Sequence, residues 1–121
     1  LHALVTDETR HMINAENIAK MKDGVLIVNA ARGALINAAD LAQALKTGKV
    51  RGAALDVYDR EPPDPSNPLL GLPNVIYTPH LGASTYEAQQ AVAEQAARQV
   101  INALLHDRFD NVRNRAVFDM L

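Results

Sequence analysis

The sequence predicts an α/β fold built on an open sheet of parallel strands. Three short apolar runs, at residues 25–29, 52–57 and 75–78, have the length of buried strands. A helical pattern separates the first run from the second, which is the spacing of a βαβ unit. Each run also ends in polar residues. Because the carboxyl ends of parallel strands lie along one edge of a sheet, where open α/β sheets bind ligands, these polar residues are expected to form a site there.

Length and composition limit the classes of protein to which the chain can belong. Its 121 residues suit one modest domain, and 48% hydrophobic with 21% charged residues is ordinary for a globular protein. A net charge of −2 without a long like-charge run argues against a nucleic-acid partner, and the apolar stretches are too short to cross a membrane. The absence of cysteine excludes disulfides and thiolate metal ligands. We therefore expect a cytoplasmic protein without a metal site.

The first expected elements are a strand end, a short helix and a buried strand. Leu1–Val5 is apolar except for His2 and is expected to be the end of a strand already under way. Asn14 is a plausible N-cap for a helix over Ala15–Met21, which the following Asp-Gly pair would end. The four consecutive apolar residues of the strand at 25–29 favour burial on both faces.

A second helix and a second strand complete the βαβ unit. Asn37 could cap a helix over Ala38–Lys46, and Gly48 supplies its stop signal. The strand at 52–57 follows and consists mainly of small apolar residues.

The second half of the chain contains a long loop, a strand and the longest helix. Residues 60–73 carry all but one of the six prolines, and loops of this length in compact domains are often functional. Ser84 and Glu87 form a capping-box pattern that would open a helix over 85–105. Alanine and valine recur along this helix at four-residue spacing, which predicts close packing against another helix or the sheet.

Four polar side chains near the expected carboxyl edge have the chemistry of an active site. Arg32 offers a planar fork to a carboxylate, although an arginine in a solvent-facing turn would have the same pattern. Asp56 could accept a hydrogen bond from a ligand or cap neighbouring backbone amides. Glu61 and His80 could pair, so that the carboxylate orients the imidazole and stabilises its protonated form. A glutamate in a polar loop could equally be solvated.

Several linked motifs make the chain resemble the D-isomer-specific 2-hydroxyacid dehydrogenases. Within that family, the run from His80 to Thr85 is most similar to members that act on D-3-phosphoglycerate in serine biosynthesis. The motifs follow one another from residue 1 to about residue 105: His2 with Thr6-Asp7-Glu8-Thr9, Met21-Lys22-Asp23-Gly24, Val28-Asn29-Ala30-Ala31-Arg32-Gly33, Gly52-Ala53-Ala54-Leu55-Asp56-Val57-Tyr58, Glu61-Pro62, and Thr78-Pro79-His80-Leu81-Gly82-Ala83-Ser84-Thr85.

The resemblance implies a fold, a cofactor and a reaction. Residues 1–105 would be the C-terminal, catalytic half of a Rossmann-like doubly wound NAD-binding domain, and residues 106–121 a connection towards the substrate domain. The enzyme would oxidise a small D-2-hydroxy acid, or reduce the 2-oxo acid, with NAD as its cofactor. It would be a homo-oligomer such as a dimer, with neither nucleic acid nor membrane as a partner.

The resemblance also implies a role for individual residues. Arg32 would hold the carboxylate and carbonyl of the substrate, and His80 would exchange a proton with its hydroxyl. Glu61 would pair with His80. Asp56 would contact the nicotinamide end of NAD, and Ala3 would lie near its adenosine side. The other positions expected to line the cofactor, in part shared with catalysis, are Ala30, Ala31, Arg32, His80, Leu81, Gly82 and Ala83.

Departures from the family pattern leave alternatives to an enzyme. The glycine-rich turn that holds the phosphates of a dinucleotide does not occur in the chain, nor does a substrate domain, so we expect a fragment of a longer protein. Ala3 stands where the family usually has a proline, and residues 111–121 match no family pattern. A non-enzymatic, corepressor-like NAD sensor and an inactive fragment are the alternative interpretations.

Overall fold

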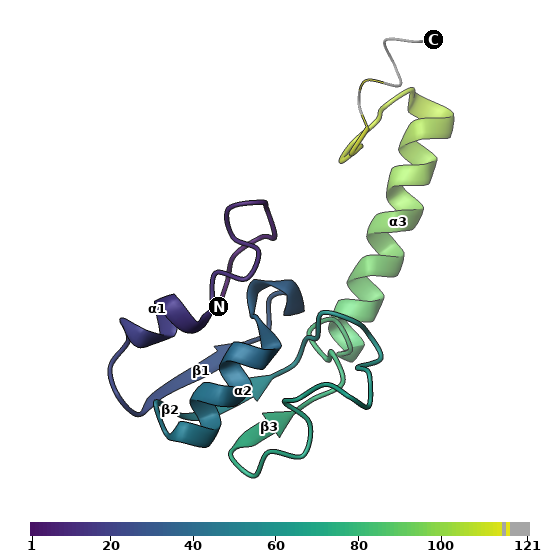
Figure 1. The fold of residues 1–121 in the computed structure, drawn as a ribbon. Coiled ribbons are helices and arrows are strands. Elements are labelled where there is room, and N and C mark those ends of the chain that lie inside the picture. The colour runs from purple at the N-terminus through teal and green to yellow at the C-terminus, as the bar shows by residue number, and fades with distance from the viewer. Residues whose placement is uncertain (115, 117–121) are drawn as a thin grey trace. The chain divides into compact units, whose positions relative to one another are not determined.

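A computed structural model of the chain describes residues 1–114 and 116, which divide into two compact units. The first unit spans Leu1–Gly82, and the second begins at Ala83. No helix in the described part of the chain combines the length and hydropathy needed to cross a membrane. The elements, labelled in Figure 1, are α1 (Ala15–Ala19), β1 (Val25–Asn29), the 3-10 turn η1 (Gly33–Leu35), α2 (Ala38–Thr47), β2 (Val50–Leu55), β3 (Val75–Tyr77) and α3 (Tyr86–His106).

The three strands form one parallel sheet in the order β1-β2-β3, which confirms the predicted α/β architecture. The helix α2 is the crossover between β1 and β2. In the register of the sheet, Asn29 lies beside Leu55, and Leu55 lies beside Tyr77. These are the last residues of their strands, so the segments that follow all three strands start from the same edge.

One face of the sheet is covered and the other is bare. On the covered face, Ile27, Ala53 and Val75 are neighbours in the register, and each is less than 9% exposed. The apolar face of α2 packs on this side. The core they form also includes Ile13, Ile18, Ile36, Leu41, Leu45, Val50, Leu55 and Leu69.

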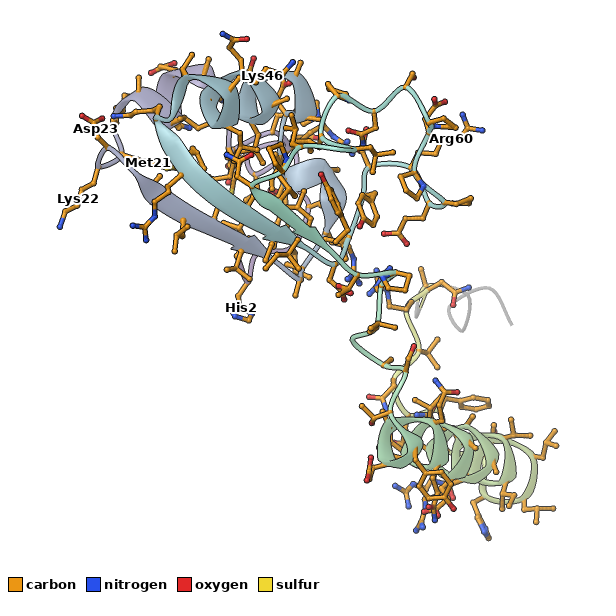
Figure 2. All side chains as sticks on the ribbon, turned by 90° about the horizontal axis from the view of Figure 1, so that it is seen from below. His2, Met21, Lys22, Asp23, Lys46 and Arg60 are labelled. Atoms are coloured by element: carbon orange, nitrogen blue, oxygen red, sulfur yellow. The ribbon has the colours of Figure 1, made fainter. Side chains whose placement is uncertain are left out.

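On the bare face, Leu26, Val28 and Ile76 are 59%, 60% and 69% exposed. Figure 2 places Lys46 of α2 on one side of the sheet and His2 on the other. The expectation that β1 is buried on both faces is therefore wrong for this chain, because no helix of residues 1–82 covers the second face.

Two expectations about the first elements need correction. Leu1–Val5 forms no strand; only the amino nitrogen of Leu1 reaches the sheet, at 2.6 Å from the carbonyl oxygen of Val28. The chain turns away because Thr9 bonds through its hydroxyl to the carbonyl of Leu4 (2.6 Å) and the N–H of Thr6 (2.8 Å). The helix capped by Asn14 ends at Ala19, two residues early, and Met21 then closes a turn onto Ile18.

The second strand begins and ends two residues earlier than predicted. It spans Val50–Leu55, so Asp56 lies just beyond it. Arg51 belongs to the strand although its side chain is charged, because that side chain projects to the exposed face while Val50 is buried. The helix α2 has its N-cap at Asn37 and its left-handed C-cap at Gly48, both as predicted.

The second unit contains α3, which starts at a different cap from the predicted one. The hydroxyl of Thr85, not Ser84, accepts the N–H of Ala88 at 3.1 Å. None of the residues of α3 is buried, so the predicted packing of its alanine-rich side is not seen in the described part of the chain. Of the expected connection at residues 106–121, residues 115 and 117–121 lie outside the described residues.

Candidate active site

A buried asparagine shapes the turn that follows β1. Asn29 is 1% exposed, although its side chain is polar. Its amide nitrogen donates to the carbonyl of Arg32 at 2.9 Å, and its amide oxygen accepts the N–H of Ala31 at 3.1 Å. The turn is thereby tied to the end of the strand, with Ala30 exposed and Ala31 half-buried. Asn29 is not among the predicted site residues, although a polar residue at the end of a buried strand is a usable signal.

Arg32 leaves this turn without an ion-pair partner among the described residues. The side chain is exposed, and its Nη1 donates to the carbonyl of Ala31 at 2.7 Å. Within residues 1–114 and 116, no carboxylate forms an ion pair with it. The remaining N–H donors can therefore bind an anion such as a carboxylate, for which the planar fork of arginine is suited.

The next residue fixes the distance between this turn and the segment after β2. A Cβ on Gly33 would lie 1.9 Å from the carbonyl carbon of Tyr58 and 2.3 Å from the backbone nitrogen of Asp59. Only glycine fits such a close approach of two backbones. The turn that carries Arg32 therefore lies directly against the segment that leads to Glu61.

Asp56 follows β2 and holds the turn that follows β3. Its carboxylate accepts the N–H of Leu81 at 2.9 and 3.0 Å, and the hydroxyl of Thr78 donates to the same group. The Thr78 hydroxyl, followed by the Leu81 N–H, holds the pKa of the Asp56 carboxyl below its usual value. Asp56 is therefore ionised at neutral pH and caps backbone amides, the second of the two interpretations left open by the sequence.

Glu61 and His80 form the pair that their chemistry suggested. The Nδ1 atom of His80 lies 2.6 Å from Oε2 of Glu61. The other carboxylate oxygen, Oε1, accepts the N–H of Tyr58 at 3.0 Å. The hydrogen bond with His80, and then that with Tyr58, lower the pKa of the Glu61 carboxyl from its usual value. Both side chains are partly exposed, 44% for His80 and 37% for Glu61, so a small molecule can reach them.

This pair determines which imidazole nitrogen is available. An ionised carboxylate only accepts hydrogen bonds, so Nδ1 of His80 must carry the proton between them. The other nitrogen, Nε2, is then free of a proton in the neutral ring and can take one from a bound hydroxyl. The backbone of His80 has a φ of 57°, a left-handed conformation that is uncommon for a residue with a Cβ.

The predicted site residues are thus brought together in part. Asp56 with Leu81 and Glu61 with His80 are joined through Tyr58 and Thr78 into one hydrogen-bonded network, and Arg32 lies at the same edge of the sheet. Gly82 ends the first unit, and a Cβ built on it meets nothing within 4 Å. Of the two remaining residues, Ala3 belongs to the N-terminal segment, whose first residue bonds to β1, and Ala83 is the first residue of the second unit.

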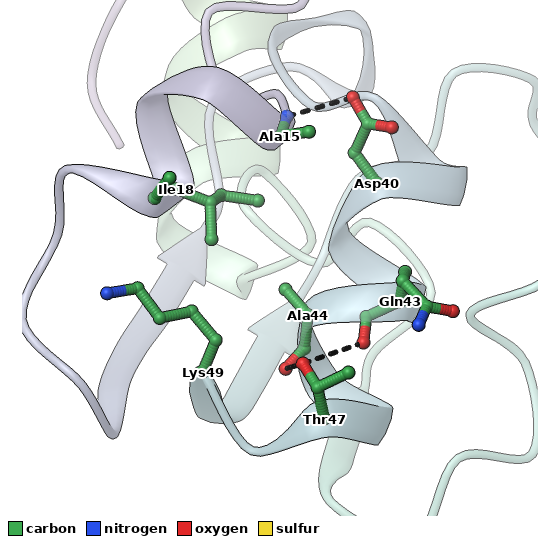
Figure 3. A pocket seen from close by; sticks show the side chains of 8 residues that line it. Ala15, Ile18, Asp40, Gln43, Ala44, Thr47 and Lys49 are labelled. Atoms are coloured by element: carbon green, nitrogen blue, oxygen red, sulfur yellow. Dashed lines mark hydrogen bonds between the residues drawn. The ribbon is translucent and has the colours of Figure 1, made fainter.

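A separate groove lies between α1 and α2, away from this network (Figure 3). In it, the carboxylate of Asp40 accepts the N–H of Ala15 at 2.9 Å, and Lys49 donates to the carbonyl of Met21 at 2.7 Å. Figure 2 shows Met21, Lys22 and Asp23 at the end of the sheet opposite to Arg60. The groove contains none of the predicted site residues. No group of three potential metal ligands occurs among the described residues.

Comparison with known proteins places the fold in a known family. Residues 1–82 match the sequence profile described as "D-isomer specific 2-hydroxyacid dehydrogenase, NAD binding domain". The chain is 53% identical over 114 residues to a D-3-phosphoglycerate dehydrogenase of Methanocaldococcus jannaschii, a match that covers 94% of this chain and 22% of that protein. It is 49% identical over 106 residues to a hydroxypyruvate reductase of Thermotoga maritima, with 86% and 35% covered.

Solved structures lead to the same group. The crystal structure of a D-lactate dehydrogenase from Aquifex aeolicus, complexed with NAD and lactic acid, superposes with a TM-score of 0.77. Its sequence is 34% identical, and the match covers 88% of this chain and 36% of that one. This chain therefore spans between about a fifth and just over a third of the length of the three relatives.

Proposed function

We infer that this chain, which belongs to the D-isomer specific 2-hydroxyacid dehydrogenase family and to its NAD-binding domain, supplies the acid–base group of an NAD-dependent dehydrogenase. The observation that carries this proposal is the contact of 2.6 Å between Nδ1 of His80 and Glu61. It leaves Nε2 as the proton acceptor in a group that small molecules can reach.

The chemistry follows from the residues at the carboxyl edge. Arg32 binds the carboxylate of a D-2-hydroxy acid through its unpaired donors and so orients the carbon that reacts. Nε2 of His80 takes the hydroxyl proton as the oxygen becomes a carbonyl, and Glu61 stabilises the imidazolium that forms. Bound NAD supplies the acceptor for the hydride, with its two electrons, that leaves the same carbon. In the opposite direction His80 returns the proton to the 2-oxo acid.

The residues near His80 fit the nicotinamide end of such a cofactor. The Asp56 carboxylate accepts from Thr78 and Leu81 and still has lone pairs for another N–H donor, since a carboxylate can accept about four hydrogen bonds. We propose that an N–H of the nicotinamide carboxamide donates to one of these remaining lone pairs. Small residues leave room for a flat ring, and the proposed lining comprises Ala30, Ala31, Leu81, Gly82 and Ala83, with Ala3 towards the adenosine.

The bare face of the sheet supports the proposed place of the chain in a larger domain. Doubly wound folds carry helices on both faces of the sheet, yet Leu26, Val28 and Ile76 are more than half exposed here. We propose that residues 1–105 are the C-terminal half of the NAD-binding domain, that further parts of a longer protein cover this face, and that residues 106–121 lead to its substrate domain.

The proposed substrate is D-3-phosphoglycerate, and the proposed assembly is a homo-oligomer such as a dimer. Support for the substrate comes from identity above 50% to dehydrogenases of that name from three organisms. A second candidate is the reduction of hydroxypyruvate or glyoxylate, because relatives with those names are 49% and 44% identical.

The test is His80→Asn in the full-length protein, assayed by NADH absorbance against D-3-phosphoglycerate, D-glycerate, D-lactate and glyoxylate. A positioned acid–base group contributes about 10²–10⁴-fold, so kcat should fall by that factor. The control is His106→Asn, in the last turn of α3, which should leave kcat within about twofold. If the wild-type protein binds NAD but turns over none of these acids, the result would instead support a non-enzymatic sensor. If it neither binds NAD nor turns over any acid, the result would support the interpretation that the chain is inactive.

A further inference from the structure

We propose that Tyr58 is a positioning residue that holds the candidate catalytic residues Glu61 and His80 in register. Its backbone N–H donates to the carboxylate of Glu61, and its phenol hydroxyl donates to the carbonyl of Thr78, in the turn that carries His80. The proposal rests on the proposed function, since it concerns residues assigned to catalysis there.

The hydroxyl of Tyr58 ties the His80 turn to β2. It lies 3.1 Å from the carbonyl oxygen of Thr78 and 3.3 Å from that of Leu55, so one hydrogen is shared between the ends of two neighbouring strands. Thr78 stands two residues before His80. Partial burial, and after it the negative charge of Asp56, raises the pKa of the Tyr58 phenol above its usual value. The hydroxyl therefore stays protonated and remains a donor throughout the neutral range.

The backbone of Tyr58 makes two further contacts. Its N–H donates to Oε1 of Glu61 at 3.0 Å, which leaves Oε2 to meet His80. Its carbonyl carbon is the atom that a Cβ on Gly33 would approach to 1.9 Å, so it packs directly against the turn that carries Arg32. One residue thus touches the supports of all three candidate catalytic side chains.

Two of these contacts can be separated by mutation. Tyr58→Phe keeps the ring, the N–H bond to Glu61 and the packing on Gly33, and removes only the hydroxyl. The turn at 78–81 then keeps the Thr78 N–H bond to Leu55 and the bonds to Asp56, but loses its link through Tyr58. We expect kcat of the full-length protein to fall about 3–10-fold, because small misplacement of a catalytic group is costly, with KM changed less than about twofold.

A matched control lies in the next strand. Tyr77 also has a half-buried hydroxyl bonded to backbone carbonyls, those of Leu69 and Leu72, but its partners lie in the 60–73 loop and not in the His80 turn. Tyr77→Phe removes a comparable group from the same unit. We expect it to leave kcat within about twofold even where it lowers the melting temperature as much as Tyr58→Phe does.

A second readout does not depend on turnover. Amide hydrogen exchange of Thr78 and Leu81, measured by NMR, should be at least about threefold faster in Tyr58→Phe than in wild type, and unchanged in Tyr77→Phe. Equal exchange in the two variants, or equal kcat losses, overturns the proposal. If wild-type protein oxidises no D-2-hydroxy acid, the proposed function fails, and the exchange rates still decide whether Tyr58 positions the turn.

Discussion

Replacing Gly33 by alanine should destabilise the first unit by close to 3 kcal/mol. The added Cβ would lie 1.9 Å from the carbonyl carbon of Tyr58 and 2.2 Å from its oxygen, whereas carbon atoms in contact stay about 3.5–4.0 Å apart. The shortfall exceeds an ångström, and the obstacle is backbone that no rotamer change can remove. Overpacking costs about 1–3 kcal/mol, and a backbone obstacle belongs at the upper end of that range.

The assay is urea unfolding of the chain, followed by far-ultraviolet circular dichroism, with Gly82→Ala as the control. A Cβ on Gly82 meets nothing within 4 Å, and its φ is not in the positive range, so that variant should stay within about 0.5 kcal/mol of wild type. If Gly33→Ala also unfolds within about 0.5 kcal/mol of wild type, the close approach of the two turns is wrong. The inference that the turn carrying Arg32 lies against the segment leading to Glu61 would then fail as well.

Two further predictions concern catalysis by the full-length protein. Arg32→Lys should raise KM for the hydroxy acid by about tenfold or more with a smaller change in kcat, because an ammonium group cannot form the bidentate fork; an unchanged KM would remove Arg32 as the carboxylate anchor. Glu61→Gln should move the acid limb of the kcat/KM pH profile for oxidation to lower pH, since a neutral amide stabilises the imidazolium of His80 less than a carboxylate does. A profile that does not move would contradict the pairing of the two residues.

The architecture of the first unit was predictable because it depends on local and periodic signals. The apolar run at 25–29 predicts β1 with its observed bounds, and the run at 75–78 predicts β3 with one residue too many. The caps Asn14 and Asn37 are confirmed, because capping chemistry acts within three residues. The cap of α3 was displaced by one residue: Ser84 and Thr85 are adjacent and both can accept an amide N–H, so sequence alone does not choose between them. The apolar segment Leu1–Val5 gave no sign that side-chain bonds would turn it away from the sheet.

The site was less predictable, because its contacts join residues far apart in the chain. The motifs suggested that Glu61 and His80 would meet, and they do, across 19 residues. The hydrogen bond from the Tyr58 hydroxyl to the carbonyl of Thr78 joins residues 20 positions apart, and no local sequence pattern predicts that partner or its geometry. The same holds for the close approach at Gly33, which in the sequence has the pattern of an ordinary turn glycine.

The geometry also indicates which part of the function this chain is expected to carry. Relatives named for phosphoglycerate, hydroxypyruvate and lactate all match the same stretch, at 34–53% identity, although the chain is only 22–36% of their length. The step proposed for this chain removes a hydride from a carbon and a proton from the hydroxyl oxygen on that carbon, and the arrangement of Asp56, Glu61 and His80 is suited to that step. Choosing among the acids requires contacts to the rest of the substrate, beyond its carboxylate and hydroxyl. We therefore expect that two of these relatives could exchange the segments that correspond to residues 1–82 of this chain without a change of substrate. Each chimaera should act on the substrate of the protein that supplies its remaining residues.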